Sequence, residues 1–296
     1  MSQKTLLITG TSGFIGYNFL KYILSRNYHV IDILRTKNRK NPKLKKLKKK
    51  HPTNYKSIFF SNYFQLNSKI KKLKVNYFIN FATLYKNNHK YDDIFDFVKS
   101  NILFPTLMYD LISQKVSKVI NFGSMMQHSS SENFDSKNLY SATKNAFEMI
   151  SNFYQYKEKK TKFYNLKLYE SFGENDNRKK LIPIIIKNYK KNKSTIIVSK
   201  NLELNIIHVD DIINAITILL NKKIRPGSYC LENNKNIKIS KLIENFNKDL
   251  KRKIKVKYLK KSVTKITKSK LRKLPQWKPD SQLIKKIKLN FKNENY

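Results

Sequence analysis

The chain has 296 residues and a formal net charge of +42, carried by 62 Lys and Arg against 20 Asp and Glu. This length is enough for about two domains, or for one large α/β unit, so the chain can bury a substantial core. The single cysteine, Cys230, excludes an internal disulfide framework, and the scattered histidines form no cluster at metal-ligand spacing. We therefore expect a metal-free protein of the reducing cytoplasm.

The predicted elements alternate in type from residue 5 onward. Short β-branched and aromatic runs alternate with longer amphipathic stretches, which is typical of βαβ units around a parallel sheet. The expected strands are residues 5–9, 29–34, 57–60, 75–82, 118–123 and 163–169, and the expected helices are residues 14–25, 91–113 and 139–156. The pattern predicts an α/β protein with a Rossmann-type doubly wound parallel sheet.

The alternation becomes irregular after about residue 170, where we expect a smaller C-terminal α/β substrate-binding lobe. No low-complexity linker separates the two parts. We assign residues 1–168 to the Rossmann domain and residues 169–296 mainly to the lobe, with residues 205–221 crossing back to the first domain.

The segment TLLITGTSGFIGYNFL carries the most specific motif in the chain. A buried strand runs into Gly10, Gly13 and Gly16, and an amphipathic helix follows at once. Such a junction makes a tight turn, lets backbone N–H groups approach a pyrophosphate and places it at a helix N-terminus. We predict an NAD(P)-binding loop that also includes Ser12, Phe14 and Ile15.

The end of the second strand, VIDILRTKNR, indicates which cofactor the loop serves. An NAD-binding fold usually places Asp or Glu at the strand tip to bind the ribose hydroxyls. Here Asp32 precedes the expected tip, which is Arg35 followed by Lys37. A basic tip suits a 2′-phosphate, so we predict NADP(H), with NAD(H) as the alternative.

The high charge also raises the question of a nucleic-acid or membrane partner. The lysines are spread along the whole chain, and only residues 39–51, RKNPKLKKLKKKH, resemble a patch. A nucleic-acid binder would concentrate its charge with aromatics placed for stacking, so we expect a solvated loop or short surface helix here. No run of about 18 apolar residues occurs, and the first residues lack a signal-peptide core. We expect neither a specific nucleic acid nor a membrane as partner.

The segment LYSATK contains a Tyr-x-x-x-Lys pair, Tyr140 and Lys144, on a predicted helix. The same spacing joins Tyr17 to Lys21, Tyr156 to Lys160 and Tyr189 to Lys193. Only Tyr140 follows a strand that ends in Gly-Ser, at Ser124. A Lys ammonium one helical turn from a phenol can lower its pKa toward the working range, so we predict Tyr140 and Lys144 as a proton-transfer couple.

The motifs TGTSGFIG, NFATLY, NFGS and LYSATK, in this order, resemble the extended short-chain dehydrogenase/reductase family of NAD-dependent epimerases and dehydratases. The later segments LKLYESFGEND, LIPIII, IIHVDDIINAI and QWKPD resemble further family motifs, so the resemblance covers nearly the whole chain. FATLY and the short loop after strand five are most similar to the CDP-abequose and CDP-paratose synthase type of nucleotide-sugar 4-ketoreductase.

The resemblance implies roles for individual residues. It makes Ser124, Tyr140 and Lys144 catalytic, with Tyr140 and Lys144 also near the cofactor, and it adds Phe81 and Ala82 to the cofactor site. The substrate-binding candidates are Thr83, Asn101, Ser124, Met125, Arg178, Lys179 and Trp277. The resemblance implies that Asn101 orients the active-site helix or a water, with an N-terminal or surface polar residue as the alternative. For Met125 the alternative is a pocket or core filler, and for Trp277 it is a side chain that pins the C-terminal segment to the core.

The chain departs from the family pattern near the substrate. Ser124 is followed by Met-Met-Gln instead of the Asp-Glu pair of the 4,6-dehydratases, so dehydration is not expected. Leu204 replaces a family arginine that often binds the diphosphate, Glu174 replaces a proline, and Lys167 replaces the arginine of strand six. His208 with the Asp210–Asp211 pair resembles part of a metal site, but no third ligand is clustered with the histidine and this pair. We therefore expect an aspartate to cap the next helix there.

The leading hypothesis is NADPH-dependent reduction of the 4-keto group of a nucleoside-diphosphate 4-keto-6-deoxyhexose, for bacterial surface polysaccharide. An NAD-dependent nucleotide-sugar 4-epimerase is the first alternative. A catalytically weak binding module that uses its basic surface is the second. The resemblance also implies a homodimer formed through the helices at residues 91–113 and 139–156.

Overall fold

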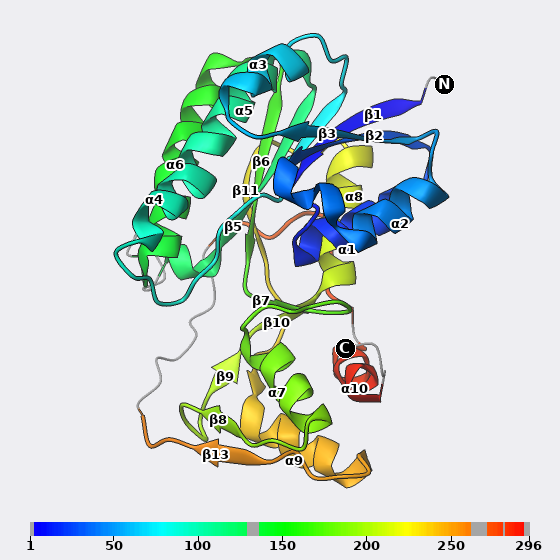
Figure 1. Cartoon of the computed structure of the whole chain (residues 1–296). Coiled ribbons are helices and arrows are strands. Elements are labelled where there is room, and N and C mark those ends of the chain that lie inside the picture. Colours follow the sequence, from blue (N-terminus) through cyan, green and yellow to red (C-terminus); the bar gives the residue numbers. More distant parts are fainter. Residues whose placement is uncertain (1–2, 129–135, 262–270, 281, 293–296) are drawn as a thin grey trace.

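The computed structural model describes residues 3–128, 136–261, 271–280 and 282–292. A seven-stranded sheet dominates it, with the strand order β11-β6-β5-β4-β1-β2-β3 and every neighbouring pair parallel (Figure 1). The strands are β1 (Lys4–Thr9), β2 (Tyr28–Arg35), β3 (Tyr55–Phe60), β4 (Tyr77–Asn80), β5 (Lys118–Ser124), β6 (Lys162–Leu168) and β11 (Gly227–Leu231). The strand order reverses between β1 and β4, which confirms the predicted Rossmann-type sheet.

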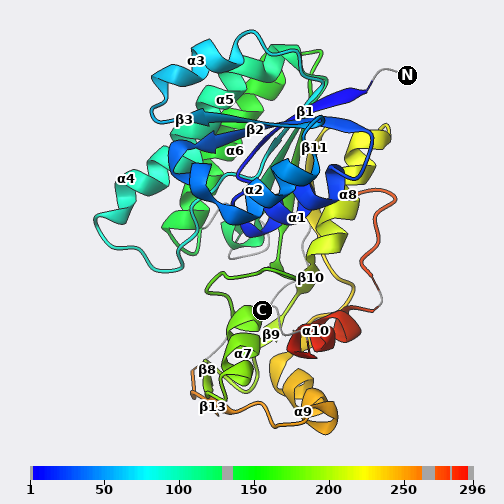
Figure 2. The same ribbon diagram turned by 45° about the vertical axis from the view of Figure 1, so that its right-hand side comes forward.

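Helices cover both faces of this sheet (Figures 1 and 2). On one side lie α1 (Phe14–Ile23), α2 (Pro42–Lys50) and α8 (Val209–Asn221), and on the other lie α3 (Phe64–Ile70), α4 (Asp93–Val98), α5 (Phe104–Ile112) and α6 (Leu139–Lys157). Leu6 and Ile8 of β1 enter the core with α1 and α8, and Leu7 enters the core with α5 and α6. Both faces of the strand are therefore buried, as its unbroken apolar run predicts.

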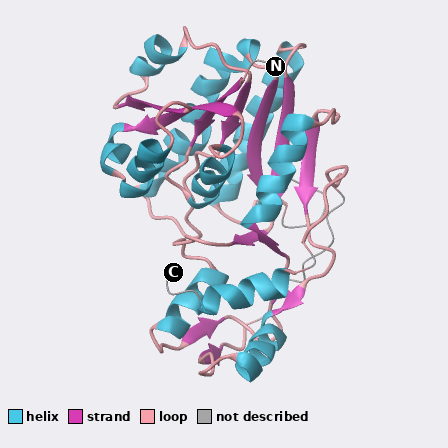
Figure 3. Ribbon diagram, turned by 90° about the vertical axis from the view of Figure 1, so that its right-hand side faces the viewer, coloured by secondary structure: helices cyan, strands magenta, loops and turns pink. Residues whose placement is uncertain are grey.

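A smaller lobe lies next to the sheet domain and is seen below it in Figure 3. It contains β7 (Glu170–Phe172), α7 (Leu181–Lys190), β8 (Thr195–Ile197), β9 (Glu203–Leu204), β10 (Ile206–His208), β12 (Ile237–Lys238), α9 (Ile239–Asp249), β13 (Val256–Tyr258) and α10 (Leu283–Lys292). Its own core is built from Phe172, Ile185, Ile243 and Ile287, among others. The short parallel pair β7–β10 lies at the junction with the sheet domain.

The segment that returns to the sheet domain is longer than the predicted residues 205–221. Beyond α8, strand β11 pairs with β6 as the seventh strand, and Leu274 and Trp277 join the core of the α1 face. The backbone N–H of Cys230 in β11 donates a hydrogen bond to the Arg272 carbonyl. Strand β11 begins with Gly-Ser and has polar flanks, so hydrophobic periodicity does not predict this edge strand.

One expected helix differs from the prediction, and the basic segment forms the short surface helix that was one of its two expected forms. The long helix predicted at 91–113 is interrupted by a π turn at Lys99–Leu103, between α4 and α5. Within the basic segment 39–51, α2 is a surface helix that buries Leu44 and Leu47 and is capped by the Asn41 side chain. Within the described residues no helix is long and apolar enough to span a membrane.

Candidate active site

A cleft of about 1100 Å³ opens where the carboxyl ends of the sheet strands face the small lobe. It includes the switch point between β1 and β4, where open α/β sheets usually bind their ligands. Fifteen of the predicted site residues line it: Gly10, Ser12, Gly13, Phe14, Ile15, Gly16, Arg35, Phe81, Ala82, Thr83, Ser124, Tyr140, Lys144, Arg178 and Lys179. Residues as far apart in sequence as Gly10 and Lys179 thus contribute to one site.

The glycine-rich turn forms one wall of the cleft. Gly10 has φ +76°, and a Cβ there would lie 2.4 Å from the Ala82 backbone nitrogen. A larger residue would therefore clash with the chain leaving β4, besides adopting a strained conformation. Gly13 donates its N–H to the Gly10 carbonyl at 3.0 Å, and α1 begins at the next residue. This compact turn before a helix N-terminus has the features that suit a dinucleotide pyrophosphate.

The tip of β2 forms the far end of the cleft, where Arg35 and Asn38 line the wall. Asp32 does not reach this surface, because it is fully buried. Its Oδ2 accepts hydrogen bonds from the hydroxyls of Thr11, at 2.5 Å, and Tyr55, at 2.8 Å. Burial raises the pKa of the Asp32 carboxyl to about 7. Asp32 thus supports the glycine-rich turn from beneath.

Ser124, Tyr140 and Lys144 meet at the centre of the cleft. Ser124 is the last residue of β5, and the other two lie one turn apart at the start of α6, which is capped by the Asn138 side chain. The Ser124 and Thr83 side chains lie near the Tyr140 hydroxyl, and both lower its pKa. All three predicted catalytic residues are less than a tenth exposed.

Burial shifts the two titratable groups of this cluster in opposite directions. It raises the pKa of the Tyr140 phenol to about 12, an effect that the Arg178 charge and the hydrogen bonds from Ser124 and Thr83 partly offset. It lowers the pKa of the Lys144 ammonium to about 8, against the opposing charge of Glu148. Desolvation disfavours the charged form of each group, which explains both signs.

Asn101 lies behind the cleft wall and does not line the cleft. Its Oδ1 accepts from the Thr83 hydroxyl and the Leu84 N–H, and its Nδ2 donates to the Thr143 hydroxyl of α6. Asn101 sits in the π turn, a local distortion that often marks functional sites. Its hydrogen bonds tie Thr83 to α6, which agrees with the helix-orienting role that the resemblance implied for Asn101, and it makes no direct contribution to the cleft lining.

Met125 and Trp277 also lie outside the cleft lining. The Met125 sulfur lies 3.6 Å from the Cys230 sulfur, and Met126 reaches the cleft instead. The Trp277 indole N–H donates to the Asp211 carbonyl at 2.8 Å inside the core. Trp277 therefore pins the C-terminal segment to α8, which was the alternative reading of this residue.

Lys167 and the start of α8 are further positions singled out in the sequence. Lys167, which replaces a family arginine, is 1% exposed and lies 3.0 Å from Glu148, so its ammonium faces the interior. Helix α8 is capped by the His208 ring, which accepts the Asp210 N–H, rather than by an aspartate. The described residues contain no group of three or more His, Cys, Asp or Glu that could hold a metal ion.

A ladder of buried asparagines supports the cleft floor, and it was not predicted. Asn80, Asn121 and Asn165 are direct neighbours in the register of β4, β5 and β6. Asn80 donates to Asn121 at 3.1 Å, and Asn121 to Asn165 at 3.4 Å. Thr9 of β1 donates to Asn80, which itself lines the cleft. The repeated Ile-Asn-Phe of two expected strands was the sequence signal for this ladder.

The lobe side of the cleft carries several basic side chains. Arg178 makes a two-pronged ion pair with Asp176, at 2.7 and 2.6 Å, and its guanidinium lies 4.3 Å from the Phe14 ring centre. Lys180 pairs with Glu170 at 3.0 Å, and Lys179 lines the wall between them. Because Asp176 fixes the Arg178 guanidinium, this side chain would lose less conformational entropy on binding an anion than a mobile side chain would.

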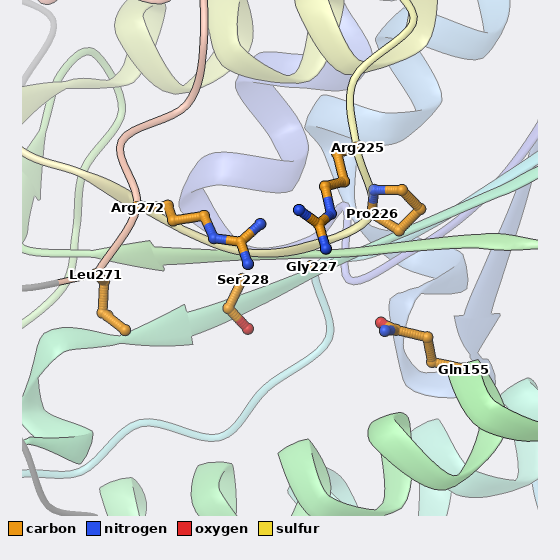
Figure 4. A pocket seen from close by; sticks show the side chains of 7 residues that line it. All are labelled: Gln155, Arg225, Pro226, Gly227, Ser228, Leu271 and Arg272. Atoms are coloured by element: carbon orange, nitrogen blue, oxygen red, sulfur yellow. The ribbon is translucent and has the colours of Figure 1, made fainter.

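A second, more open hollow of about 610 Å³ lies at the start of the edge strand β11 (Figure 4). It is lined by Gln155, Arg225, Pro226, Gly227, Ser228, Leu271 and Arg272. None of the predicted site residues belongs to it, so the cleft at the switch point is the candidate active site.

A doubly wound sheet with a glycine-rich turn at its switch point and a buried Ser, Tyr and Lys beside it is typical of an enzyme that uses a nicotinamide dinucleotide. The chain belongs to the NAD-dependent epimerase/dehydratase family, whose model matches residues 6–231. It is accordingly an NAD(P)-dependent enzyme of the extended short-chain dehydrogenase/reductase type, a group of nucleotide-sugar epimerases, dehydratases and reductases.

Individual relatives are distant. The CDP-abequose synthase of Salmonella muenchen is 24% identical over 267 residues, which cover 86% of this chain and 84% of that protein. A UDP-glucuronic acid 4-epimerase from Bacillus cereus, solved with UDP-glucuronic acid and NAD, has a TM-score of 0.81 at 18% identity and covers 97% and 98% of the two chains. A UDP-N-acetylglucosamine 4-epimerase from Methanobrevibacter ruminantium M1 has a TM-score of 0.82 at 21% identity, with 99% and 98% covered. The structural likeness shows a shared fold.

Proposed function

We propose that this enzyme uses NADPH to reduce the 4-keto group of a nucleoside-diphosphate 4-keto-6-deoxyhexose. The observation that carries the proposal is the meeting of Ser124, Tyr140 and Lys144 in one buried cluster beside the glycine-rich turn. The similarity to a CDP-abequose synthase over most of the chain supports the choice of a 4-keto sugar.

The chain's own residues supply the proton chemistry of such a reduction. When bound, the nicotinamide cofactor supplies the hydride. Tyr140 donates the proton to the carbonyl oxygen, since its raised pKa keeps the phenol protonated before the reaction. Lys144 stabilises the phenolate that forms, and Ser124 hydrogen-bonds the same substrate oxygen.

The positions after Ser124 argue against dehydration. Met126 lines the cleft without a titratable group, and Gln127 is fully buried with its amide already hydrogen-bonded. Elimination of water needs an acid and a base near the sugar carbons. The residues after Ser124 offer neither, so they favour a reductase or an epimerase.

The tip of β2 supports NADPH as the preferred cofactor. Arg35 lines the cleft at the position where an NAD-binding fold carries an acid, and a guanidinium matches a phosphate in geometry and charge. The nearest acid, Asp32, is buried and accepts from Thr11 and Tyr55, so it is turned away from a ribose at the surface.

The substrate diphosphate would lie at the lobe side of the cleft. Arg178 and Lys179 line that wall, and the Asp176 carboxylate holds the Arg178 guanidinium in one orientation. These two cations would compensate for Leu204, which occupies the place of a family arginine.

A nucleotide-sugar 4-epimerase is the second candidate, because both solved relatives named above are 4-epimerases with the same fold. The two activities differ in cofactor balance. A reductase consumes one NADPH for each product, whereas an epimerase returns the hydride to the sugar and consumes none.

The test follows NADPH absorbance while the purified protein acts on a CDP-4-keto-6-deoxyhexose, with NADH in parallel. We expect net consumption, faster with NADPH, and we expect Tyr140→Phe to lower kcat by about 10²- to 10⁴-fold, the usual contribution of a general acid. NADPH affinity of the variant should stay unchanged. Net conversion of a UDP-sugar without cofactor consumption would support the epimerase, and full activity of Tyr140→Phe would refute the assignment of the proton donor.

We also propose a homodimer formed through α4 and α6, which pack against each other on the outside of the sheet domain (Figure 1). Exposed apolar side chains run along both helices, at Phe95, Val98, Met149, Phe153 and Tyr156. Residues 139–156 contain one basic side chain, that of Lys144, which is buried. Lys99 after α4 and Lys159 after α6 lie over the Phe95 and Tyr156 rings, at the ends of these helices. In a chain with net charge +42, a face with so few cations is where two like-charged copies can meet.

A further inference from the structure

Gln127 is a fully buried polar residue directly below Ser124. It ends the one-turn 3-10 helix Met125–Gln127 that follows β5. Its side-chain Oε1 accepts the Ser124 N–H at 2.7 Å, and the Ser124 hydroxyl oxygen accepts the Met126 N–H at 3.2 Å. This reciprocal capping fixes both the backbone and the side chain of Ser124.

The other end of the same amide reaches the helix that carries Tyr140 and Lys144. Gln127 Nε2 donates to Asn145 Oδ1 and to Glu148 Oε2, each at 2.7 Å, and both partners lie on α6. A single side chain thus bridges the segment of Ser124 and the helix of the other two catalytic candidates.

The hydrogen-bond partners of the Gln127 amide allow it one orientation. The Glu148 carboxylate lies 3.0 Å from the buried Lys167 ammonium and accepts from the Ser228 hydroxyl at 2.9 Å, so it is held in place as an acceptor. With Nε2 toward this carboxylate, Oε1 must face the Ser124 N–H. A flipped amide would oppose donor to donor and acceptor to acceptor, which a buried site disfavours strongly.

Strand β5 leaves room for the Gln127 side chain at Gly123. A Cβ at that position would lie 2.7 Å from Gln127 Oε1 and 3.0 Å from the Lys167 side chain. Gly123 has ordinary backbone geometry for a strand, so the close approach of Gln127 is what requires a glycine in the Gly-Ser pair.

We propose that Gln127 is a positioning residue that holds Ser124 in register with Tyr140 for proton transfer, an inference that rests on the proposed function. Its amide couples β5 to α6 through the Glu148–Lys167 pair. Loss of the bridge would let Ser124 and Tyr140 drift apart while leaving the glycine-rich turn intact. A misplacement of about 1 Å can cost about 100-fold in rate.

The test compares Gln127→Leu with Gln155→Leu. Gln155 is an exposed glutamine on α6, the helix that Gln127 contacts, so the change in side chain is matched. For Gln127→Leu we expect kcat to fall by about 10- to 100-fold while the Kd of NADPH stays unchanged. Gln155→Leu should keep wild-type values. Unchanged kcat in Gln127→Leu, or a parallel loss of NADPH affinity, would overturn the positioning role.

Two further measurements keep the test decisive. If Gln127→Leu does not fold, Gln127→Glu retains the shape and the acceptor toward Ser124 but loses the donor toward Glu148, and the same kcat loss is expected. Crystal structures of the wild type and the variant that folds should show Ser124 displaced relative to α6, and an undisplaced Ser124 would refute the inference. An inactive wild-type protein would refute the proposed function alone, because the crystallographic readout needs no turnover.

Discussion

Burial shifts the pKa values of Tyr140 and Lys144, the proposed proton donor and its partner, in opposite directions. The pKa of the phenol rises to about 12 and that of the ammonium falls to about 8, so both groups bear protons at neutral pH. The buried Glu148 carboxylate, one turn beyond Lys144, opposes the drop in the Lys144 pKa. The charge state of Lys144 therefore depends on a residue that does not line the cleft.

This dependence predicts a pH effect of Glu148→Gln. Activity should decline as the pH rises through the Lys144 pKa of about 8, because the neutral amine no longer stabilises a phenolate. Removing the Glu148 charge lowers that pKa further, so the alkaline limb of kcat/KM should move to lower pH. Profiles of wild type, Glu148→Gln and the control Glu158→Gln, at the far end of α6, measure the shift. Superimposable alkaline limbs would contradict the coupling.

Asp32 gives a second residue-scale prediction, for stability. Its folded-state pKa of about 7 exceeds the ordinary value of 3.8, so ionisation of this carboxyl costs stability as the pH rises from about 4 to about 7. The variant Asp32→Asn keeps an acceptor for Thr11 and Tyr55 and cannot ionise. Its free energy of unfolding, minus that of wild type, should therefore increase across this window.

The size of this increase is up to about 4 kcal/mol, since one pKa unit corresponds to about 1.4 kcal/mol. Oδ1 of Asp32 has no hydrogen-bond partner, so the amide of Asp32→Asn adds a cost that does not vary with pH. Urea unfolding of both proteins at a series of pH values measures the difference. Parallel curves for the two proteins would show that Asp32 does not ionise in this range.

Local patterns predicted most of the residues that line the cleft, and distant contacts decided the rest. Gly10 follows β1, Ser124 is the last residue of β5 and Tyr140 lies in the first turn of the helix after β5, so motif order was sufficient to bring them to one edge of the sheet. Trp277 and Met125 were misplaced because their partners, Asp211 and Cys230, are 66 and 105 residues away. Sequence spacing carries no information about such contacts.

At the scale of elements, hydrophobic periodicity predicted the central strands and α6 well. Hydrophobic periodicity did not predict the π turn, the short helix α3 or the lysine-rich helix α2. The π turn at Lys99–Leu103 keeps the apolar pattern of one continuous helix, and α3 has seven residues, too few for a clear period. Helix α2 buries only Leu44 and Leu47 among its lysines, so its amphipathic character was masked by charge.

The exposed apolar face of α4 and α6 leads to a prediction about assembly. Met149, Phe153 and Tyr156 follow one another at helical spacing, and Phe153 is 56% exposed. The change Phe153→Lys places a cation in the proposed interface between two basic copies. It should convert the dimer to a monomer in analytical ultracentrifugation, with NADPH binding retained.

A matched change on the small lobe controls for added charge. Ile196→Lys alters a residue that is 64% exposed on β8, away from both helices, and should leave the dimer intact. A monomeric wild-type protein, or a dimer that persists in Phe153→Lys, would rule out this interface.

The distribution of charge over the whole molecule connects assembly, stability and binding. Within α4 and α6 the exposed lysine is Lys157, the last residue of α6, whereas the cleft collects Arg35, Arg178 and Lys179 at its two ends. A net charge of +42 repels itself within the folded chain and attracts anionic ligands to the cleft. Salt should therefore act on stability and on cofactor binding with opposite signs.

We expect sodium chloride to raise the Tm of the ligand-free protein, because it screens this self-repulsion within a Debye length of about 10 Å at 0.1 M and about 3 Å at 1 M. The same screening should weaken NADPH binding, and more steeply than NADH binding, because the 2′-phosphate adds charge opposite Arg35. Thermal unfolding and fluorescence titrations over one salt series measure both effects, with sucrose as the uncharged control. Equal salt dependence for the two cofactors would contradict a phosphate contact at Arg35, and a Tm that falls with salt would show that ion pairs outweigh the repulsion of the net charge.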